Sequence, residues 1–476
     1  MLLKVTFEHL RVEKIMETVK LISPIDGSVY AERQLASDSE INAIVERAKT
    51  AQIAWAATPI AERGRYLLAF LEALLAMNDE IVPELAWQMG RPVRYGGEKG
   101  GVEERTRYMV DLAAAALADV IPHDSKPGFH RYLRRVPLGT VLVIAPWNYP
   151  YLTAINTIVP ALMSGNAVIL KHAAQTLLVG ERFVKAFEAA GLPKGVFQTI
   201  VLSHAQTEKL LGSGRIDHCN FTGSVAGGRA IEKVAAGTFM TLCLELGGKD
   251  PAYVLPDVKL DHAVANLVDG AFYNSGQCCC GIERVYVHEE IYDDFVEGFI
   301  AETRNYVVGN PLDPATTMGP MAQARFADFI REQKAEALRK GATAHVGMKV
   351  ENDCAGSPYL APEVLTNVNH QMSVMREESF GPIVGIMKVA DDDEAIQLMN
   401  DSPFGLTASL WTADTDRAAA LGDRIETGMV FMNRCDYVDP GLVWTGVKDT
   451  GKGGAMGRVG YDNLTRPKGF HLREAI

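Results

Sequence analysis

The chain has 476 residues, and no hydrophobic run in it approaches the roughly 18 residues that a membrane-spanning helix requires. It also lacks an excess of positive charge: the formal net charge is −12, which argues against nucleic acid as the main partner. The first twenty residues have neither an apolar core nor a small-residue cleavage site, so we expect no secretory signal. Internal repeats and low-complexity segments are missing too. We therefore expect a globular protein without a membrane or nucleic-acid partner.

Cysteine is scarce, with seven residues, and its distribution argues against two common uses. The thiols have no CxxC or CxxH partner nearby, so we predict no metal site. An odd number of cysteines in a long chain does not suit a disulfide framework, and we place the protein in the cytoplasm. Three cysteines are consecutive, at Cys278, Cys279 and Cys280. They are either small core residues or a nucleophile between two other thiols.

The N-terminal part of the chain indicates mostly helices. The first fifteen residues differ in character from the rest of the chain, so the true start is either Met1 or Met16. A Pro/Gly turn and a short strand are expected within 22–35. Apolar residues then recur every three or four positions, which predicts helices over 37–57, 59–90 and 102–120. Asp38 is the expected N-cap of the first of these.

Short apolar strands alternate with helical segments from residue 141 onward. Such strands, buried on both faces and separated by helices, predict a Rossmann-like, doubly wound parallel sheet in an α/β protein. Sheets of this kind bind ligands beyond the carboxyl ends of their strands. The expected strands are 141–145, 167–171, 196–201, 218–223 and 241–246, and the helices are 151–163, 178–190, 205–212 and 224–236.

A second α/β series follows the first. Its expected strands are 252–255, 284–288, 382–389, 407–412 and 430–433, and its helices are 261–273, 290–306 and 322–340. Two further strands, near 130–136 and 469–474, belong to neither series. We predict that these two pair with each other and serve an oligomer.

Two polar residues stand where strands of the first series end. Asn148 lies between two prolines, and its amide could donate to a developing oxyanion or simply cap a helix. Glu245 precedes Gly247 and Gly248, and it is either a general base at the ligand edge of the sheet or a surface carboxylate before a turn.

Two other segments suit a nucleotide. Phe221-Thr222-Gly223-Ser224 joins a strand to a helix, and glycines near a helix N-terminus suit a phosphate, although the G-x-G-x-x-G pattern is missing. In Glu377-Glu378-Ser379-Phe380, a carboxylate could accept ribose hydroxyls and the ring could flank a planar heterocycle. The alternative is a charged turn.

The segments PWNYP, ILK, FTGS, LELGGK, GQCCC and EESFGP, in this order, resemble the aldehyde dehydrogenase superfamily, with 34 residues separating Glu245 from Cys279. The resemblance begins near Ile22 and covers the rest of the chain. It implies that Cys279 is the nucleophile and Glu245 the general base. It further implies that Asn148 and the backbone N–H of Cys279 stabilise the oxyanion.

The resemblance implies NADP or NAD as cofactor. NAD-preferring relatives often have a glutamate where this chain has Ala174, so we predict that NADP is accepted. His172 replaces a usual proline and either helps to bind phosphate or faces solvent. The residues that the resemblance assigns to the cofactor are Ile144, Ala145, Pro146, Trp147, Lys171, Ala174, Phe221, Gly223, Ser224, Leu246, Gly247, Glu378 and Phe380.

The substrate implied by the resemblance is a small-molecule aldehyde. The positions that should line its tunnel contain no arginine or lysine, which favours a neutral or hydroxylated aldehyde over a dicarboxylic semialdehyde. These positions are Tyr149, Leu152, Asn156, Cys278, Cys280, Tyr437 and Trp444.

The implied reaction is oxidation of the aldehyde to the carboxylic acid, through a thiohemiacetal and a thioester on Cys279. Glu245 favours hydrolysis of the thioester over transfer to coenzyme A. Two alternatives remain: a thiol esterase or acyl-transfer enzyme without redox chemistry, and a catalytically silent structural relative.

The resemblance also implies a division of the chain and a homodimer or homotetramer. The expected units are a cofactor-binding domain (1–121 and 138–246), a catalytic domain (247–440) and oligomerisation strands (122–137 and 455–476).

Overall fold

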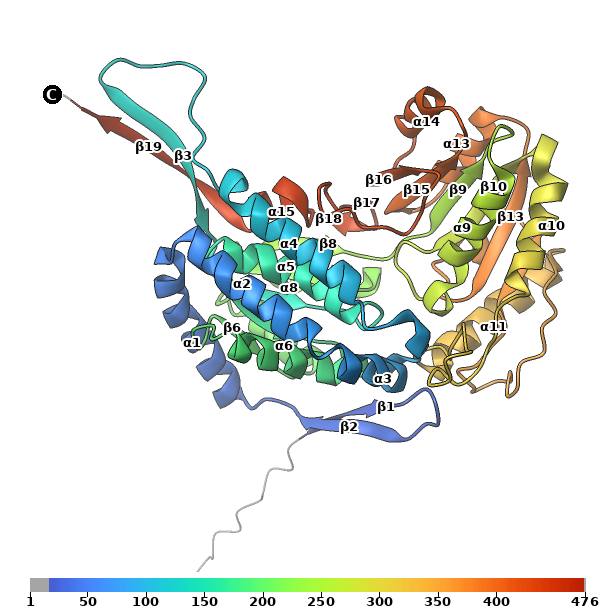
Figure 1. Ribbon diagram of the computed structural model, residues 1–476, viewed down its shortest axis with the longest axis horizontal. Coiled ribbons are helices and arrows are strands. Elements are labelled where there is room, and N and C mark those ends of the chain that lie inside the picture. Colours follow the sequence, from blue (N-terminus) through green and yellow to red (C-terminus); the bar gives the residue numbers. More distant parts are fainter. Residues whose placement is uncertain (1–16, 475–476) are drawn as a thin grey trace, which may run out of the picture.

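The computed structural model describes residues 17–474, so the choice between Met1 and Met16 lies outside the described residues. The molecule has two lobes, each an α/β sheet with helices on both faces, and a two-stranded ribbon projects from one of them (Figure 1). Within residues 17–474, no helix is long and apolar enough to cross a membrane.

The first lobe contains a six-stranded sheet. All neighbouring strands are parallel except the edge strand β18, which is antiparallel to β8. The doubly wound sheet predicted from the apolar strands is thus confirmed, while β18, contributed from near the C-terminus, was not expected. The strand order is β18 (Gly451–Lys452), β8 (Thr241–Glu245), β7 (His218–Thr222), β4 (Thr140–Ile144), β5 (Ala167–Lys171) and β6 (Phe197–Thr199).

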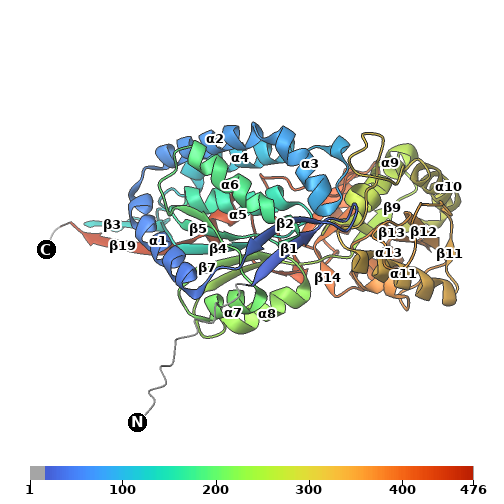
Figure 2. The ribbon, with the colours of Figure 1, turned by 90° about the horizontal axis from the view of Figure 1, so that it is seen from below.

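Helices cover both faces of this sheet (Figure 2). One face packs against α2 (Ile60–Leu75), α4 (Lys99–Ala116), α5 (Pro150–Met163) and α6 (Leu177–Ala189). The other face packs against α1 (Asp38–Ala57), α7 (His204–Gly212) and α8 (Val225–Ala235).

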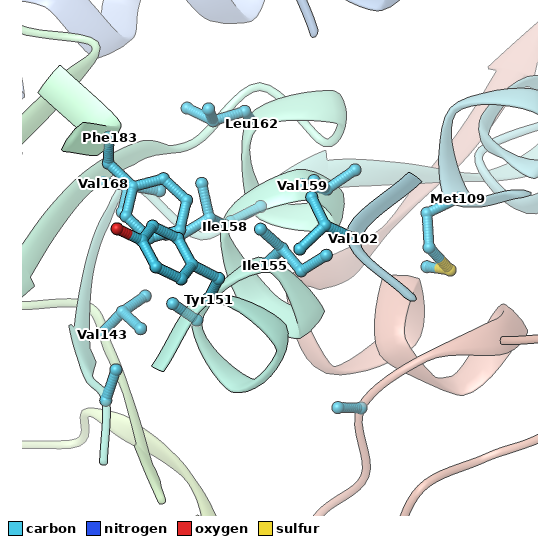
Figure 3. Close-up of a cluster of buried hydrophobic side chains, with 14 of the residues drawn as sticks. Val102, Met109, Val143, Tyr151, Ile155, Ile158, Val159, Leu162, Val168 and Phe183 are labelled. Atoms are coloured by element: carbon cyan, nitrogen blue, oxygen red, sulfur yellow. The ribbon is translucent and has the colours of Figure 1, made fainter. Parts of the chain in front are cut away.

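Helix α5 is buried almost throughout because it lies between the sheet and the outer helices. Figure 3 shows Ile155, Ile158 and Val159 of this helix within one apolar cluster. The ring of Tyr151 packs against that of Phe183, with centroids 5.5 Å apart. The start of α5 therefore has a fixed position relative to the sheet.

The second lobe contains a seven-stranded sheet, parallel except for the edge strand β11. Its order is β11 (Thr343–Ala344), β12 (Glu363–Thr366), β13 (Ile383–Val389), β10 (Ile282–His288), β9 (Asp250–Val254), β15 (Thr407–Trp411) and β16 (Met429–Met432). One face packs against α9 (Leu260–Phe272) and α10 (Tyr292–Thr303). The other packs against α11 (Ala324–Arg339), α12 (Ser373–Arg376), α13 (Asp392–Asn400) and α14 (Thr415–Gly422).

Two predictions about the N-terminal helices were wrong in detail. The expected helix over 59–90 is two helices, α2 and α3 (Asn78–Met89), because Met77 leaves the helical conformation and acidic residues favour a new helix start. The N-cap of α1 is Ser37 rather than Asp38. The Ser37 hydroxyl accepts from the N–H of Glu40, and the Glu40 carboxylate accepts from the N–H of Ser37, which forms a capping box.

The remaining strands of residues 17–474 form three antiparallel pairs, one of which is the projecting ribbon. Strand β3 (Phe129–Pro137) pairs with β19 (Thr465–Arg473) along its whole length, which confirms the predicted pairing. The smaller pairs are β1 (Thr18–Ile22) with β2 (Val29–Gln34) and β14 (Phe404–Gly405) with β17 (Val447–Lys448), and α15 (Gly457–Asn463) precedes β19.

The role of the ribbon in an oligomer stays a prediction. A chain shortened after Thr465 loses β19, and we expect it to elute from gel filtration as a smaller assembly than the full chain. A chain shortened after Glu474 keeps the whole strand and serves as the control. An unchanged assembly size after removal of β19 would refute the role.

Candidate active site

The three consecutive cysteines follow a turn with unusual backbone conformation. Asn274, Ser275 and Gly276 have φ values of 54°, 58° and 68°. Left-handed conformations in residues other than glycine are costly and persist where the surroundings impose them. A Cβ at Gly276 would collide with the backbone of Gly381, so glycine is required there. The turn thus carries Cys279 close to the loop that precedes β13.

Two cavities meet at Cys279 and Glu245. The first has a volume of about 280 Å³, and the second about 180 Å³. Thr222, Glu245, Leu246 and Cys279 line both of them. A molecule in one cavity can therefore react with a molecule in the other beside a thiol and a carboxyl group.

Asn148 follows β4 and is 3% exposed. Its Nδ2 donates to the carbonyl of Gln277 at 3.1 Å, which ties it to the cysteine loop and leaves its second amide hydrogen available to the first cavity. Its own carbonyl accepts from Arg91 and from Asn274. The N-cap position of α5 is Tyr149, so the capping alternative for Asn148 is wrong.

Glu98 supplies the cap that α5 needs, and the sequence reasoning missed it. One of its carboxylate oxygens accepts from the N–H groups of Tyr151 (3.0 Å) and Leu152 (2.7 Å). The other pairs with Arg91, whose guanidinium lies over the Tyr149 ring at 4.8 Å. Glu98 has φ 66°, and the glycine pairs on either side of it are the signal that a tight loop forms there. Glu98 and Arg91 therefore position the segment that carries Asn148.

Glu245 ends β8 and is 6% exposed, so the surface-carboxylate alternative is wrong. Its Oε2 accepts from the Thr222 hydroxyl at 3.0 Å, while its buried Oε1 has no protein partner among residues 17–474. Burial raises the pKa of Glu245 to about 7, against the opposing effects of Thr222 and Arg105. A carboxyl group with this pKa can take up a proton near neutral pH.

The first cavity contains eight of the thirteen residues predicted for the cofactor. The Oε1 of Glu378 accepts from the N–H of Gly248 at 3.1 Å, and burial raises the pKa of Glu378 to about 8. A Cβ at Gly247 would collide with the Glu378 carboxylate. The predicted residues in this lining are Pro146, Trp147, Gly223, Ser224, Leu246, Gly247, Glu378 and Phe380.

A buried ion pair holds the loop that carries Glu378 and Phe380, and the sequence reasoning missed this pair too. Lys249 pairs with Glu283, and both are almost fully buried. The Glu283 carboxylate also accepts from the N–H groups of Ser379 (2.7 Å) and Phe380 (2.9 Å). These contacts fix the loop, in which Phe380 has φ 51°.

Five of the predicted cofactor residues lie outside the lining of the first cavity: Ile144, Ala145, Lys171, Ala174 and Phe221. Burial lowers the pKa of Lys171, which has no ion pair within the described part of the chain. The ring of Phe221 packs on Gly223 and Gly227, where an added Cβ would come within 2.7 Å of it. Ser224 caps α8 by accepting from the N–H of Gly227.

His172 is buried, and both expectations for it were wrong. Its Nδ1 contacts the N–H of Ala173 and the Thr176 hydroxyl, each at 2.9 Å, and its Nε2 lies 3.2 Å from the carbonyl of Pro150. Burial lowers the pKa of His172 to about 4. A neutral ring with both nitrogens occupied neither binds phosphate nor faces solvent.

The second cavity brings together six of the seven predicted substrate residues: Tyr149, Leu152, Asn156, Cys278, Cys280 and Trp444. Tyr437 is not in the lining. Its hydroxyl contacts the Glu104 carboxylate, while its neighbours Asp436 and Val438 face the cavity.

The second cavity also contains charged groups, so the predicted uncharged wall was wrong. Arg105 of α4, Asp269 of α9 and Asp436 line it. Arg105 lies outside the motifs that carry the resemblance. The sequence pattern that could have identified it is helical spacing, which places Arg105 on the buried face of α4 together with Val102 and Met109.

The model of the aldehyde dehydrogenase family matches residues 11–470. This chain belongs to that family. The succinate-semialdehyde dehydrogenase [NADP(+)] of Mycobacterium avium (strain 104) is 34% identical over 451 residues, covering 93% of this chain and 94% of its own. Succinate-semialdehyde dehydrogenase [NADP(+)] 1 of Mycobacterium tuberculosis (strain ATCC 25618 / H37Rv) is 33% identical over 437 residues, covering 91% and 95%.

Solved structures of other proteins share the fold of this aldehyde dehydrogenase. PnpE in complex with nicotinamide adenine dinucleotide superposes with a TM-score of 0.91 at 30% identity, covering 97% of this chain and 95% of that one. Succinic semialdehyde dehydrogenase from Streptococcus pyogenes in complex with NADP+ has a TM-score of 0.90 at 25% identity, covering 96% and 100%.

Proposed function

We propose that this aldehyde dehydrogenase oxidises its aldehyde to the free acid through a thioester on Cys279, with Glu245 as the base for hydrolysis. The observation that carries the proposal is the meeting of two cavities at these two residues. Absorbance at 340 nm, followed with a panel of aldehydes and with both cofactors, tests it. Absence of reduced cofactor with every aldehyde would overturn it.

The first step is addition of the Cys279 sulfur, in its thiolate form, to the aldehyde carbon. The carbonyl oxygen gains negative charge, and we assign its stabilisation to the Asn148 amide and the backbone N–H of Cys279. The bond from Asn148 to Gln277 fixes the amide before the substrate arrives. One such fixed donor is commonly worth about 10²–10³ in rate.

The first cavity suits the reactive end of NADP or NAD. A planar ring can pack against Phe380, and Glu378 can accept from ribose hydroxyls. Position 247 must be glycine, because any side chain there would collide with the Glu378 carboxylate. The bound nicotinamide supplies the acceptor for the hydride that the substrate carbon loses.

Hydrolysis completes the reaction. The Oε1 of Glu245 has no protein partner among the described residues, so it is available to a water molecule. Glu245 takes a proton from this water, the resulting hydroxide attacks the thioester carbon, and the acid leaves with release of the Cys279 sulfur. The relatives named for succinate semialdehyde make this aldehyde the first substrate to test.

We further propose that NADP is accepted at least as well as NAD. Ala174 provides no carboxylate to repel a 2′-phosphate, and Lys171 is a cation without an ion pair in residues 17–474. The NADP(+) in the names of the mycobacterial relatives supports the same preference. A wild-type preference for NAD above about tenfold in kcat/KM, or ~1.4 kcal/mol, would refute it.

The variant Ala174→Glu tests the physical reason. We expect the ratio of kcat/KM for NADP to that for NAD to fall at least about tenfold, because the new carboxylate repels a 2′-phosphate. Ala174→Gln is the matched control, since it adds the same bulk without charge. Equal changes in the two variants would assign the effect to size.

A further inference from the structure

We propose that Arg105 binds an anionic group of the substrate, so that the preferred substrates are short aldehydes with a carboxylate at the other end. The inference rests on the proposed function, because Arg105 lines the same cavity as Cys279.

Arg105 is a buried cation with few partners. It is 9% exposed, and its Nη1 donates to Asn156 Oδ1 at 3.0 Å and to the Leu152 carbonyl at 3.5 Å. Its Nε is buried without a partner, and no carboxylate of residues 17–474 forms an ion pair with it. A buried guanidinium without a counter-ion is unfavourable, and an arriving anion relieves that cost. The site therefore has an unmet requirement for negative charge.

The chemistry of the group suits a carboxylate. A guanidinium presents several N–H donors in one plane, a geometry that matches the two oxygens of a carboxylate. The bond to Asn156 Oδ1 occupies one donor and fixes the orientation of that plane. The Nη2 group of Arg105 has no protein partner among residues 17–474 and is the donor available to a ligand in the cavity.

The size of the cavity limits the chain. A volume of about 180 Å³ holds roughly six groups of the size of a water molecule, taking ~30 Å³ for each. Cys279 lines the same space, so an aldehyde carbon at its sulfur and a carboxylate at Arg105 are separated by a few carbon atoms at most. A four-carbon semialdehyde is small enough for this volume.

The other charged groups of the cavity must be compatible with an anion. Asp269 and Asp436 come from the second lobe, and Glu245 from the end of β8. Burial raises the pKa of all three, to about 7 for Glu245 and for Asp436. Below about pH 7 Glu245 and Asp436 hold their protons, while Arg105 stays charged. The binding of an anionic aldehyde should weaken as the pH rises above 7.

The first test compares three aldehydes of equal chain length: succinate semialdehyde, butanal and 4-(trimethylammonio)butanal. In the wild type we expect kcat/KM to be at least tenfold higher for succinate semialdehyde than for butanal. In Arg105→Gln we expect the loss for succinate semialdehyde to exceed the loss for butanal at least thirtyfold, mainly through KM. Arg105→Lys keeps the charge and should recover part of this difference.

Two results would overturn the proposal: equal losses for both aldehydes in Arg105→Gln, or a wild-type preference for butanal or the cationic aldehyde. The latter would assign recognition to Asp269 and Asp436. Oxidation of none of the three aldehydes would instead count against the proposed function itself.

A second measurement needs no variant and so does not depend on the folding of Arg105→Gln. Butyrate and butyramide have the same shape, but only butyrate carries a charge. We expect butyrate to inhibit butanal oxidation by the wild-type enzyme at least tenfold more strongly than butyramide, in competition with the aldehyde. Equal inhibition by the two compounds would overturn the proposal.

Discussion

Replacement of Cys279 by alanine is expected to lower aldehyde-dependent reduction of NADP by at least about 10⁴-fold, since loss of a nucleophile removes the covalent route altogether. Without the sulfur, no thiohemiacetal forms, and the substrate carbon keeps its hydrogen. Absorbance at 340 nm under saturating aldehyde measures the effect. A measurement of cofactor binding by the variant shows whether the first cavity is intact.

Cys278 is the alternative nucleophile and the natural control. Hydrogen bonds from Cys279 and then Cys280 lower the pKa of Cys278, and the bond to Cys278 raises the pKa of Cys279. Position favours Cys279 nevertheless, because it lines both cavities while Cys278 and Cys280 line only the second.

We therefore expect Cys278→Ala and Cys280→Ala to change mainly KM for the aldehyde. The two sulfur atoms lie 3.5 Å apart, within the part of the lining assigned to the substrate. Loss of turnover in Cys278→Ala together with retained turnover in Cys279→Ala would show that the nucleophile is Cys278.

Replacement of Glu245 by glutamine is expected to stop the reaction after one turnover. The variant should still form the thioester and reduce about one equivalent of cofactor, because glutamine keeps the side-chain shape and can accept from Thr222. Hydrolysis should then slow by about 10²–10⁴-fold, the usual contribution of a general base. Stopped-flow absorbance resolves the burst from the steady rate. A steady rate equal to that of the wild type would contradict the assignment.

The raised pKa of Glu245 gives this residue two opposite pH dependences. The base is the carboxylate, so the hydrolysis rate of the wild type should rise as the pH increases through about 7. Stability should change in the other direction. Folding raises the pKa of Glu245 above the unfolded value of about 4.3, so the folded state loses up to ~4 kcal/mol of stability as the pH rises from that value through 7.

Glu245→Gln removes that cost. We expect the variant to have a higher Tm than the wild type at pH 8, and a smaller difference at pH 5, by differential scanning fluorimetry. A shift of equal size at both pH values would mean that ionisation of Glu245 is not its cause.

The chemistry of the site was largely predictable from local sequence. Each strand of the first series is an apolar run that ends at a polar or glycine-rich segment, and in a parallel sheet such ends meet at one edge. Asn148 and Glu245 follow from this rule, and the order of the motifs added Cys279. Pairing of the two lone strands was predicted as well, since both lie outside the two α/β series.

The predictions that failed concern residues whose surroundings come from distant parts of the chain. His172 looked available for phosphate, yet the start of α5 and Thr176 occupy its ring nitrogens. Tyr437 and Asp436 are neighbours in sequence, and only the direction of the loop decides which of them faces the cavity. The positions of motifs along the sequence do not show which side chain of this loop faces the cavity.

The sequence by itself determined the two α/β series and the residues to which we assign the reaction, because these depend on local patterns and on their order along the chain. Tertiary structure alone decided that Glu98 caps α5 and that Arg105 faces the thiols. The physical reason is that packing between distant segments sets the surroundings of a buried charged side chain, and local sequence patterns do not record those surroundings.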